Sequence, residues 1–274
     1  MNVLLTGAFG TVGTAIIEHL ADESGYNFTY LDRKPHPEFE AQVADVADRS
    51  AIEPAFEGQD AVVHLAGNPS PGAPWGDVLE SNIIGTYNVL SAAAQAGVER
   101  VMFASTNHVM GLYRGAATPG VDHEYDSDLL VRHDDPPKPD SYYAVSKLAG
   151  EHLGQYHVEG RGAPERFYAI RIGWVLDPPY DHPYGGAERA VDRGDVERGS
   201  AKYEQLAAAS KGLWCSRRDI ANLTECVLGD DSVGFDVFYA RSAGSDQWLD
   251  IEHARTVLGY EPRDDADTYE PPAG

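Results

Sequence analysis

The sequence predicts an α/β fold, a doubly wound parallel β-sheet with helices on both faces and a small C-terminal lobe. Three observations lead to this prediction. Strand-like apolar runs alternate with helical segments through the first 172 residues. A glycine-rich turn, Gly7–Gly13, separates the first run from the first helix. The run Asp60–Leu65 is apolar at its centre, which is typical of a strand that helices cover on both faces.

Short apolar runs bounded by turn-forming residues predict the strands, and longer segments of helical periodicity predict the helices. The expected strands are Asn2–Thr6, Asn27–Asp32, Ala41–Ala44, Asp60–Leu65, Arg100–Ser105, Arg166–Arg171 and Phe235–Ala240. The expected helices are Thr11–Asp22, Asp48–Phe56, Trp75–Ala96, Ser141–His157, Tyr203–Ser210, Arg217–Leu228 and Asp250–Leu258. Prolines and glycines make Gly67–Pro74 a loop, so the next helix begins near Trp75, and Gly259 ends the last helix.

The alternation breaks after Arg171, which divides the chain into two parts. We expect residues 1–172 to form the sheet domain and residues 173–274 a small substrate-binding lobe, together one compact unit. The stretch Asp177–Arg198 is rich in Pro, Gly and charge, which predicts a loop or mobile flap. The polar tail Pro262–Gly274 is expected to be frayed.

The chain carries a formal charge of −23, with 44 acidic against 21 basic residues among 274. The acids are spread along the sequence, which predicts an acidic folded surface and argues against partners such as nucleic acid or anionic membranes. A halophilic source is the simplest explanation, and an ordinary acidic enzyme is the alternative. No apolar run is long enough to cross a bilayer and no signal peptide is evident, so we expect a cytoplasmic protein. The two cysteines have no ligand-like neighbours, and we expect no metal.

The turn Gly7–Gly13 has the context that a dinucleotide site needs, a strand before it and a helix after it. In such a Rossmann fold Gly7 allows the tight turn, Gly10 lets the backbone approach a pyrophosphate, and Gly13 lets the helix pack closely. The helix N-terminus then offers free N–H groups to the phosphates. Phe9, Thr11 and Val12 complete the expected cofactor loop.

Asp32 ends the second strand, 19 residues after Gly13. An acid there accepts hydrogen bonds from the ribose hydroxyls and repels a 2′-phosphate, which favours NAD over NADP. The adjacent Arg33 could instead accept a 2′-phosphate. Asp45 and Val46 are placed to contact adenine, although Asp45 could equally be a turn residue.

Tyr143 and Lys147 are four residues apart on a predicted helix and therefore share a face. A nearby ammonium favours the phenolate, so we expect it to lower the tyrosine pKa and make the oxygen a general base beside a nicotinamide. The alternative is an ordinary amphipathic helix that carries the pair by chance. The third member should be a hydroxyl at the end of the fifth strand, where Ser105 and Thr106 both lie.

These motifs resemble the extended short-chain dehydrogenase/reductase family over roughly residues 1–175. The resemblance implies that Thr106 orients the substrate oxygen and that Ser105 lies on the cofactor side. It also implies cofactor contacts at Ile172, a brace from Asn82 to the active-site helix, and cofactor contacts along Leu65, Ala66 and Gly67. His64, beside them, is expected to be a packing histidine.

A narrower resemblance joins Ser105–His108, Tyr142–Lys147, Arg171–Gly173 and His64–Trp75. These segments look like uronate dehydrogenases and, more closely, haloarchaeal NAD-dependent glucose-6-phosphate dehydrogenases. The resemblance implies oxidation of the C1 hydroxyl of a sugar phosphate or uronate to a lactone. It implies a homodimer built through the helices at Trp75–Ala96 and Ser141–His157. The expected substrate contacts are Ser70, Thr106, Asn107, His108 and Trp174.

Two departures concern the substrate. Ala209 stands where these groups have an arginine for the anionic group, and Trp174 replaces a small or polar residue. Candidate anion partners are Lys211, Arg189, Arg193, Arg217 and Arg218, although Arg217 and Arg218 could simply begin a helix. Two other functions stay open. A nucleotide-sugar epimerase or dehydratase would need a larger C-terminal lobe, and a cofactor-sensing protein would typically lose the catalytic tyrosine.

Overall fold

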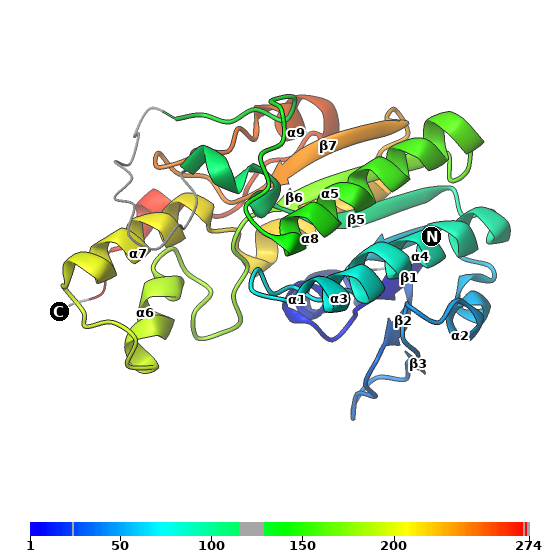
Figure 1. Ribbon diagram of the computed structural model, residues 1–274, viewed down its shortest axis with the longest axis horizontal. Helices are drawn as coiled ribbons and strands as arrows, with labels where there is room; N and C mark the ends of the chain where they lie inside the picture. Colours follow the sequence, from blue (N-terminus) through cyan, green and yellow to red (C-terminus); the bar gives the residue numbers. More distant parts are fainter. Residues whose placement is uncertain (24, 115–128, 271, 273–274) are drawn as a thin grey trace.

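The computed structural model describes residues 1–23, 25–114, 129–270 and 272, and it contains a seven-stranded parallel sheet. The strand order is β3-β2-β1-β4-β5-β6-β7, so the chain reverses direction across the sheet between β1 and β4 (Figure 1). The strands are β1 (Asn2–Thr6), β2 (Asn27–Asp32), β3 (Gln42–Val43), β4 (Ala61–His64), β5 (Arg100–Thr106), β6 (Arg166–Ile172) and β7 (Phe235–Ala240). The predicted doubly wound α/β fold is confirmed.

The helices follow the predicted order, with one addition, α6. They are α1 (Thr11–Leu20), α2 (Arg49–Ile52), α3 (Trp75–Val78), α4 (Gly85–Ala96), α5 (Tyr142–Gln155), α6 (Gly185–Asp192), α7 (Ala201–Leu213), α8 (Arg217–Gly229) and α9 (Glu252–Leu258). A π-helical turn, Leu79–Ile84, joins α3 to α4 into one continuous element.

Alternate residues of the central strands fill two hydrophobic layers. Leu5 and Val63 point to the face that α1 and α8 cover. Val62 and Phe103 point to the other face, which α4 covers together with α5. The sheet is therefore buried on both sides, which explains the continuous apolar strands.

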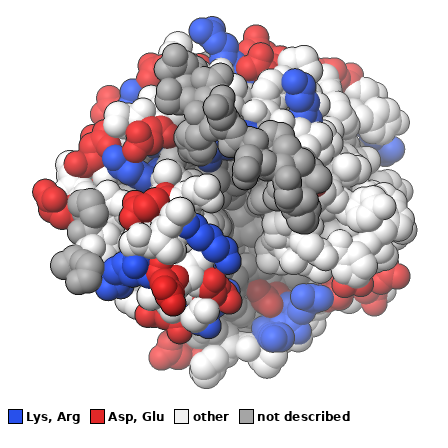
Figure 2. All heavy atoms as spheres, turned by 60° about the vertical axis from the view of Figure 1, so that its left-hand side comes forward, with Lys and Arg blue, Asp and Glu red and all other residues white. Residues whose placement is uncertain are grey.

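The carboxyl ends of the strands face α6 and α7, which stand apart from the sheet at the left of Figure 1. The division at residue 172 stays a prediction, and two later elements belong to the sheet layer, since β7 pairs with β6 and α8 packs with α1. Figure 2 shows acidic and basic side chains interspersed on this end of the molecule rather than gathered in one block.

The prediction of a loop or flap at Asp177–Arg198 is wrong for Gly185–Asp192, which forms α6. Its Ala187 packs with Tyr203 and Ala207 of α7 in a small buried cluster. A side chain at Gly186 would come within 2.8 Å of the Trp174 ring, so this glycine serves a close contact and not a flexible loop.

The expectation of a frayed tail is also wrong for much of Pro262–Gly274. The backbone N–H of Arg263 donates to the buried carboxylate of Asp219 at 2.6 Å, and Ala243 donates to the carbonyl of Asp264 at 2.9 Å. Ala266 is fully packed. Buried acceptors far away in the sequence hold this polar segment, which local composition does not reveal.

Candidate active site

The glycine turn between β1 and α1 has the geometry that a phosphate cradle needs. Gly7 has φ +68°, and a Cβ there would lie 2.7 Å from the backbone nitrogen of Ala66. A Cβ at Gly13 would lie 2.3 Å from the carbonyl oxygen of Ala8. Only glycine fits at either position, because the loop passes against the end of β4 and α1 packs directly beneath it.

The first turn of α1 is open to a ligand. Its N-cap is Gly10, and no side chain caps the helix there. The amides that follow, at Thr11 and Val12, therefore keep free donors at the positive end of the helix. This arrangement of free N–H donors fits the pyrophosphate of a dinucleotide.

Asp32 ends β2 beside this loop and holds its shape. One carboxylate oxygen accepts from the N–H of Phe9 at 3.1 Å and the other from the N–H of Lys34 at 3.2 Å. The remaining lone pairs are available to ribose hydroxyls. Arg33 lies 4.0 Å from the carboxylate of Asp45, and both side chains are largely exposed.

The adenine side of the predicted site contains Asp45 and Val46. Asp45 accepts from the N–H of Ala47 at 2.9 Å, as a turn acid does, so the alternative use of this residue is realised. Val46 is buried, and a Cβ at Gly85 would lie only 2.7 Å from Val46 Cγ2. The cofactor roles of both residues stay predictions.

The end of β4 brings the cofactor loop close to α5. Asn82 donates to Ser146 of α5 at 2.9 Å and accepts from the N–H of Asn68 at 2.7 Å. The implied brace between these elements is therefore present. Leu65, Ala66 and Gly67 follow β4 and line the gap, and a Cβ at Gly67 would lie 3.6 Å from Lys147 Nζ.

His64 is a packing histidine. Its ring nitrogens lie 2.8 Å from Thr6 Oγ1 and 3.2 Å from Thr86 Oγ1, so both are satisfied inside the core. Burial and the charge of Lys147 lower its pKa to about 3. The ring therefore stays neutral at any ordinary pH.

Thr106, Tyr143 and Lys147 are gathered at the carboxyl edge of the sheet. Thr106 ends β5, and its side chain hydrogen-bonds to the Tyr143 hydroxyl of α5. Lys147 follows one turn later, buried beside the Phe103 ring and the end of β4. The predicted trio lies together, next to the glycine loop.

Burial dominates the proton affinities of this trio. It raises the pKa of Tyr143, although the hydrogen bond from Thr106 opposes the rise. The expectation of a lowered Tyr143 pKa is therefore wrong, because a phenolate in this buried place loses more hydration than the Thr106 hydrogen bond returns. Burial also lowers the pKa of Lys147, to about 8.

The expected substrate contacts surround Tyr143 from several directions. His108 lies edge-on to the Tyr143 ring at 5.9 Å between centroids, and its Nδ1 is 2.8 Å from Asp140 Oδ2. Asn107 donates to the carbonyl of Ile172 at 3.0 Å, which ties the end of β5 to the end of β6. Ser70 is exposed in the loop before α3.

Two predicted contacts point elsewhere. The Ser105 hydroxyl donates to Glu151 on the α5 side of the sheet, so the protein already engages this hydroxyl, and a cofactor contact at Ser105 stays a prediction. The Trp174 ring lies against Gly186 of α6, which gives this residue a packing role between the sheet and the C-terminal lobe. The position of a residue in the sequence does not reveal which way its side chain points.

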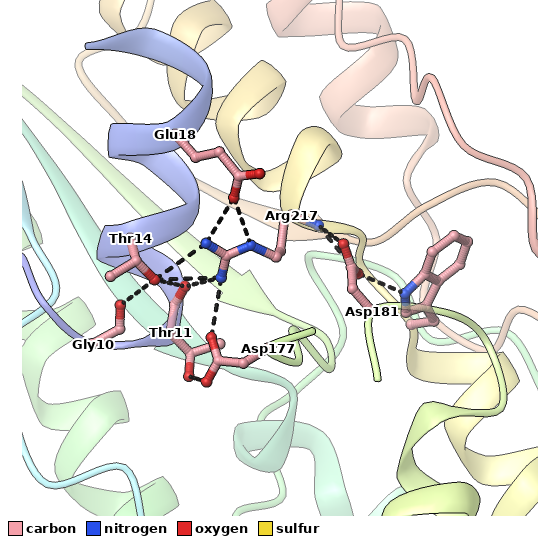
Figure 3. Close-up of polar contacts among 8 residues, drawn as sticks. Gly10, Thr11, Thr14, Glu18, Asp177, Asp181 and Arg217 are labelled. Atoms are coloured by element: carbon pink, nitrogen blue, oxygen red, sulfur yellow. Dashed lines mark hydrogen bonds and ion pairs between the residues drawn. The ribbon is translucent and has the colours of Figure 1, made fainter. Parts of the chain in front are cut away.

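Arg217 has a role that sequence reasoning missed. Figure 3 shows its guanidinium between α1 and the segment after β6. It donates to Glu18 at 2.9 Å, to the carbonyl of Thr11 at 3.1 Å and to Asp177 at 3.1 Å. Asp177 also accepts from the Thr11 hydroxyl at 2.7 Å. Arg217 thus fastens the C-terminal part onto the first turn of the cofactor helix.

This bonding removes three of the candidate anion partners. Arg217 is engaged as described, and Arg218 pairs with Asp264 at 2.5 Å. Lys211 bonds Asp246 at 2.9 Å and Asp267 at 2.7 Å.

One described cluster could bring three possible metal ligands together. Atoms of His133, Asp236 and His253 lie within 4.8 Å of one another. The two imidazoles stack at 3.5 Å with an angle of 4° between their planes. Ligating lone pairs lie in the ring planes, and nearly parallel planes do not direct them at one ion. The absence of a metal stays a prediction.

Comparison with known proteins supplies the family. Residues 3–167 match the model of the NAD-dependent epimerase/dehydratase family. The chain belongs to this family. It is 36% identical to L-arabinose 1-dehydrogenase (NAD(P)⁺) of Haloferax volcanii, over 97% of this chain and 98% of that protein. It is also 36% identical to the NAD-dependent glucose-6-phosphate dehydrogenase of the same organism, over 96% and 94%.

A solved structure agrees with this assignment. Uronate dehydrogenase from Agrobacterium tumefaciens superposes with a TM-score of 0.73 at 27% identity, covering 99% of this chain and 91% of that one. A mutant of that enzyme is described in complex with NAD. The predicted family and NAD as the cofactor are confirmed, and the alternatives are weaker because these near full-length relatives are dehydrogenases.

Among the described residues, no helix has the length and hydropathy that a bilayer crossing requires.

Proposed function

We propose that the protein oxidises the C1 hydroxyl of an aldose derivative to a lactone, with NAD as the hydride acceptor. The observation that carries the proposal is the group formed by Thr106, Tyr143 and Lys147 beside the glycine loop. Hydroxyl, phenol and amine stand at one edge of the sheet, and the first turn of α1 keeps open donors next to them. The names of the near full-length relatives support a sugar as the substrate.

Each residue of the trio has a distinct task in this proposal. The Thr106 hydroxyl now hydrogen-bonds to Tyr143, and in this proposal the same hydroxyl orients the substrate hydroxyl beside the phenol. Tyr143 takes the hydroxyl proton as the hydride leaves C1, so the products are a lactone, reduced cofactor and one proton. Lys147 holds a positive charge beside the phenolate. Bound NAD supplies the hydride acceptor and a second positive charge, which offsets the raised pKa of the buried phenol.

The remaining cofactor contacts follow from position. The loop residues Gly7, Phe9, Gly10, Thr11, Val12 and Gly13 would hold the pyrophosphate, and Asp32 would accept the ribose hydroxyls. Leu65, Ala66, Gly67, Asn82 and Ile172 would line the nicotinamide half. Ser70, Asn107 and His108 would contact the sugar.

The test is NAD reduction, followed by absorbance in molar KCl, against neutral aldoses, uronates and sugar phosphates. We expect turnover with one class of sugar. Tyr143→Phe should reduce turnover by about a thousandfold or more, because the acceptor of the proton is lost. NAD affinity, measured by quenching of tryptophan fluorescence, should change little. Wild-type turnover in this variant would disprove the base assignment, and silence of the wild type across the panel would disprove the dehydrogenase.

We also propose a homodimer formed through α3–α4 and α5. Large apolar side chains are exposed on both elements, and Trp75 meets Tyr142 edge-on at 5.7 Å. The exposed residues are Trp75, Ile84, Tyr87, Tyr142 and Val145, together with Tyr156, which directly follows α5. Exposed large apolar side chains on neighbouring helices are typical of protein–protein interaction sites. Light scattering in molar KCl should give twice the chain mass of 29.7 kDa, and Tyr87→Glu should shift it toward the monomer. A wild-type monomer would contradict the proposal.

The charge of −23 supports a protein adapted to high salt, in a cytoplasm of high ionic strength. Repulsion within this surface is screened by salt, so stability should rise as KCl increases.

A further inference from the structure

Arg241 follows β7 directly and is fully buried, at 0% exposure. Its Nη1 donates to Gln247 Oε1 at 3.0 Å. Its Nε and Nη2 have no acceptor among the described residues, and no described carboxylate lies within ion-pair distance of it. Burial lowers its pKa to about 10. An ionised guanidinium without an anionic partner is among the costliest groups to bury, which calls for an explanation.

Trp248 lies on the same loop and has the same deficit. Its indole is 4% exposed, and its Nε1–H has no acceptor within the described chain. The guanidinium of Arg114 lies over the Trp248 ring at 4.9 Å from its centroid. Arg114 is also close enough to Arg241 for the two charges to repel, which adds to the effect of burial in lowering the pKa of Arg114 to about 10. The neighbourhood is therefore rich in N–H donors.

The nearby carboxylates do not fill this deficit. Asp246 and Asp267 lie close enough to act on Arg241 electrostatically, but each is bonded to Lys211, at 2.9 and 2.7 Å. Because Lys211 engages both acids, the charge of Arg241 has no ion-pair partner among the described residues. Asp246 and Lys211 also line a cavity of about 390 Å³ beside the loop. One negative charge, with lone pairs and little bulk, would complete the group.

We infer that Arg241 and Trp248, beside Arg114, form a binding site for a small oxyanion, a phosphate or carboxylate group. The inference rests on the proposed function for its second half, that the substrate itself carries this group. Thr106 pairs in register with Ile172, and Ile172 with Ala240, the residue before Arg241. Two strand spacings separate these positions, about 10 Å. A hexose with its C1 hydroxyl at Thr106 and an anionic group at its far end is of comparable length.

The first arm of the test uses inorganic phosphate and needs no turnover. The melting temperature of the NAD-free protein is followed as phosphate replaces chloride at constant ionic strength. We expect a rise that saturates in the wild type, is absent in Arg241→Met and persists in part in Arg241→Lys, which keeps the charge. Trp248→Phe, which keeps the apolar ring but loses the N–H, should weaken the response. Arg218→Met is the matched control and should keep the full response.

The second arm identifies the source of the anion. In Arg241→Met, KM for the anionic sugar should rise by about tenfold or more while KM for a neutral aldose stays unchanged, because a charge-assisted hydrogen bond is lost only with the former. If inorganic phosphate competes with the sugar, the substrate brings the anion. If phosphate raises the melting temperature without competing, the site holds a free anion.

The outcomes separate the two proposals. Phosphate stabilisation that depends on Arg241, in a protein that oxidises no sugar, would support the anion site and defeat the dehydrogenase. Equal phosphate response in wild type and Arg241→Met, with equal KM ratios for anionic and neutral sugars, would overturn the anion site alone. If Arg241→Met does not fold, Arg241→Lys and Trp248→Phe decide by the same two readouts.

Discussion

Five cations are buried among the described residues, and they divide into two kinds. Arg100, Arg171 and Arg217 have carboxylates at bonding distance: Asp231 lies 2.8 Å from Arg100, Glu151 lies 2.9 Å from Arg171, and Glu18 and Asp177 bond Arg217. Lys147 and Arg241 form no ion pair with any described residue. Burial alone would lower the pKa of Arg171, but its pair with Glu151 raises the pKa above the usual value. For Lys147 and Arg241, burial lowers the pKa without such compensation.

The contrast indicates what each cation is for. A buried cation that the chain itself neutralises joins elements, as Arg217 joins the C-terminal part to α1. A buried cation that the chain leaves unpaired reduces stability unless a ligand supplies the missing charge or acceptor. Lys147 stands beside the proposed cofactor site. By the same reasoning, Arg241, which follows β7, is expected to meet a ligand that carries negative charge.

The largest expected effect concerns a cation of the first kind. Arg217→Met should lower the free energy of unfolding by about 2–4 kcal/mol, because it leaves the Thr11 carbonyl and Thr14 hydroxyl without their donor. Glu18 and Asp177 are half exposed and regain water, which limits the loss. Denaturant titration in molar KCl measures it. Arg218→Met, the exposed neighbour, should stay within about 0.5 kcal/mol, and equal losses in both variants would contradict the assignment.

Contacts between residues that are close in the sequence were predicted well. The turn Gly7–Gly13 and the pair Tyr143 and Lys147 were found because their spacing alone fixes which atoms meet. A hydroxyl at the end of β5 was expected because parallel strands end at one edge, and the family resemblance then favoured Thr106 over Ser105. Arg217 and Arg241 could not be told apart in this way, since their partners or lack of partners come from residues up to 206 positions away. The ordered C-terminal tail and α6 were not predicted for the same reason. Packing against residues far away in the sequence determines their structure, and local composition does not show it.

A smaller effect tests the second kind through pH. The pKa of Lys147 is about 8 in the folded protein, below its unfolded value of about 10.4. Between these values the unfolded chain binds more protons, so stability gains from rising pH, whereas below pH 8 the full penalty remains. Lys147→Met removes the titrating group. Its advantage in unfolding free energy over the NAD-free wild type should shrink by about 1 kcal/mol per pH unit between pH 8 and 10. A gap that stays constant over this range would show that Lys147 is not destabilised by burial.

The smallest expected effect has the opposite sign from that of Arg217. Methionine at position 241 keeps most of the side-chain volume and removes a charge that the described chain does not neutralise. In chloride buffer without phosphate or sugar, Arg241→Met should therefore leave the unfolding free energy unchanged or raise it by about 1 kcal/mol. The same denaturant titration that reports a loss for Arg217→Met measures this change. A loss of similar size in both variants would place Arg241 with the structural cations and remove the distinction between the two kinds.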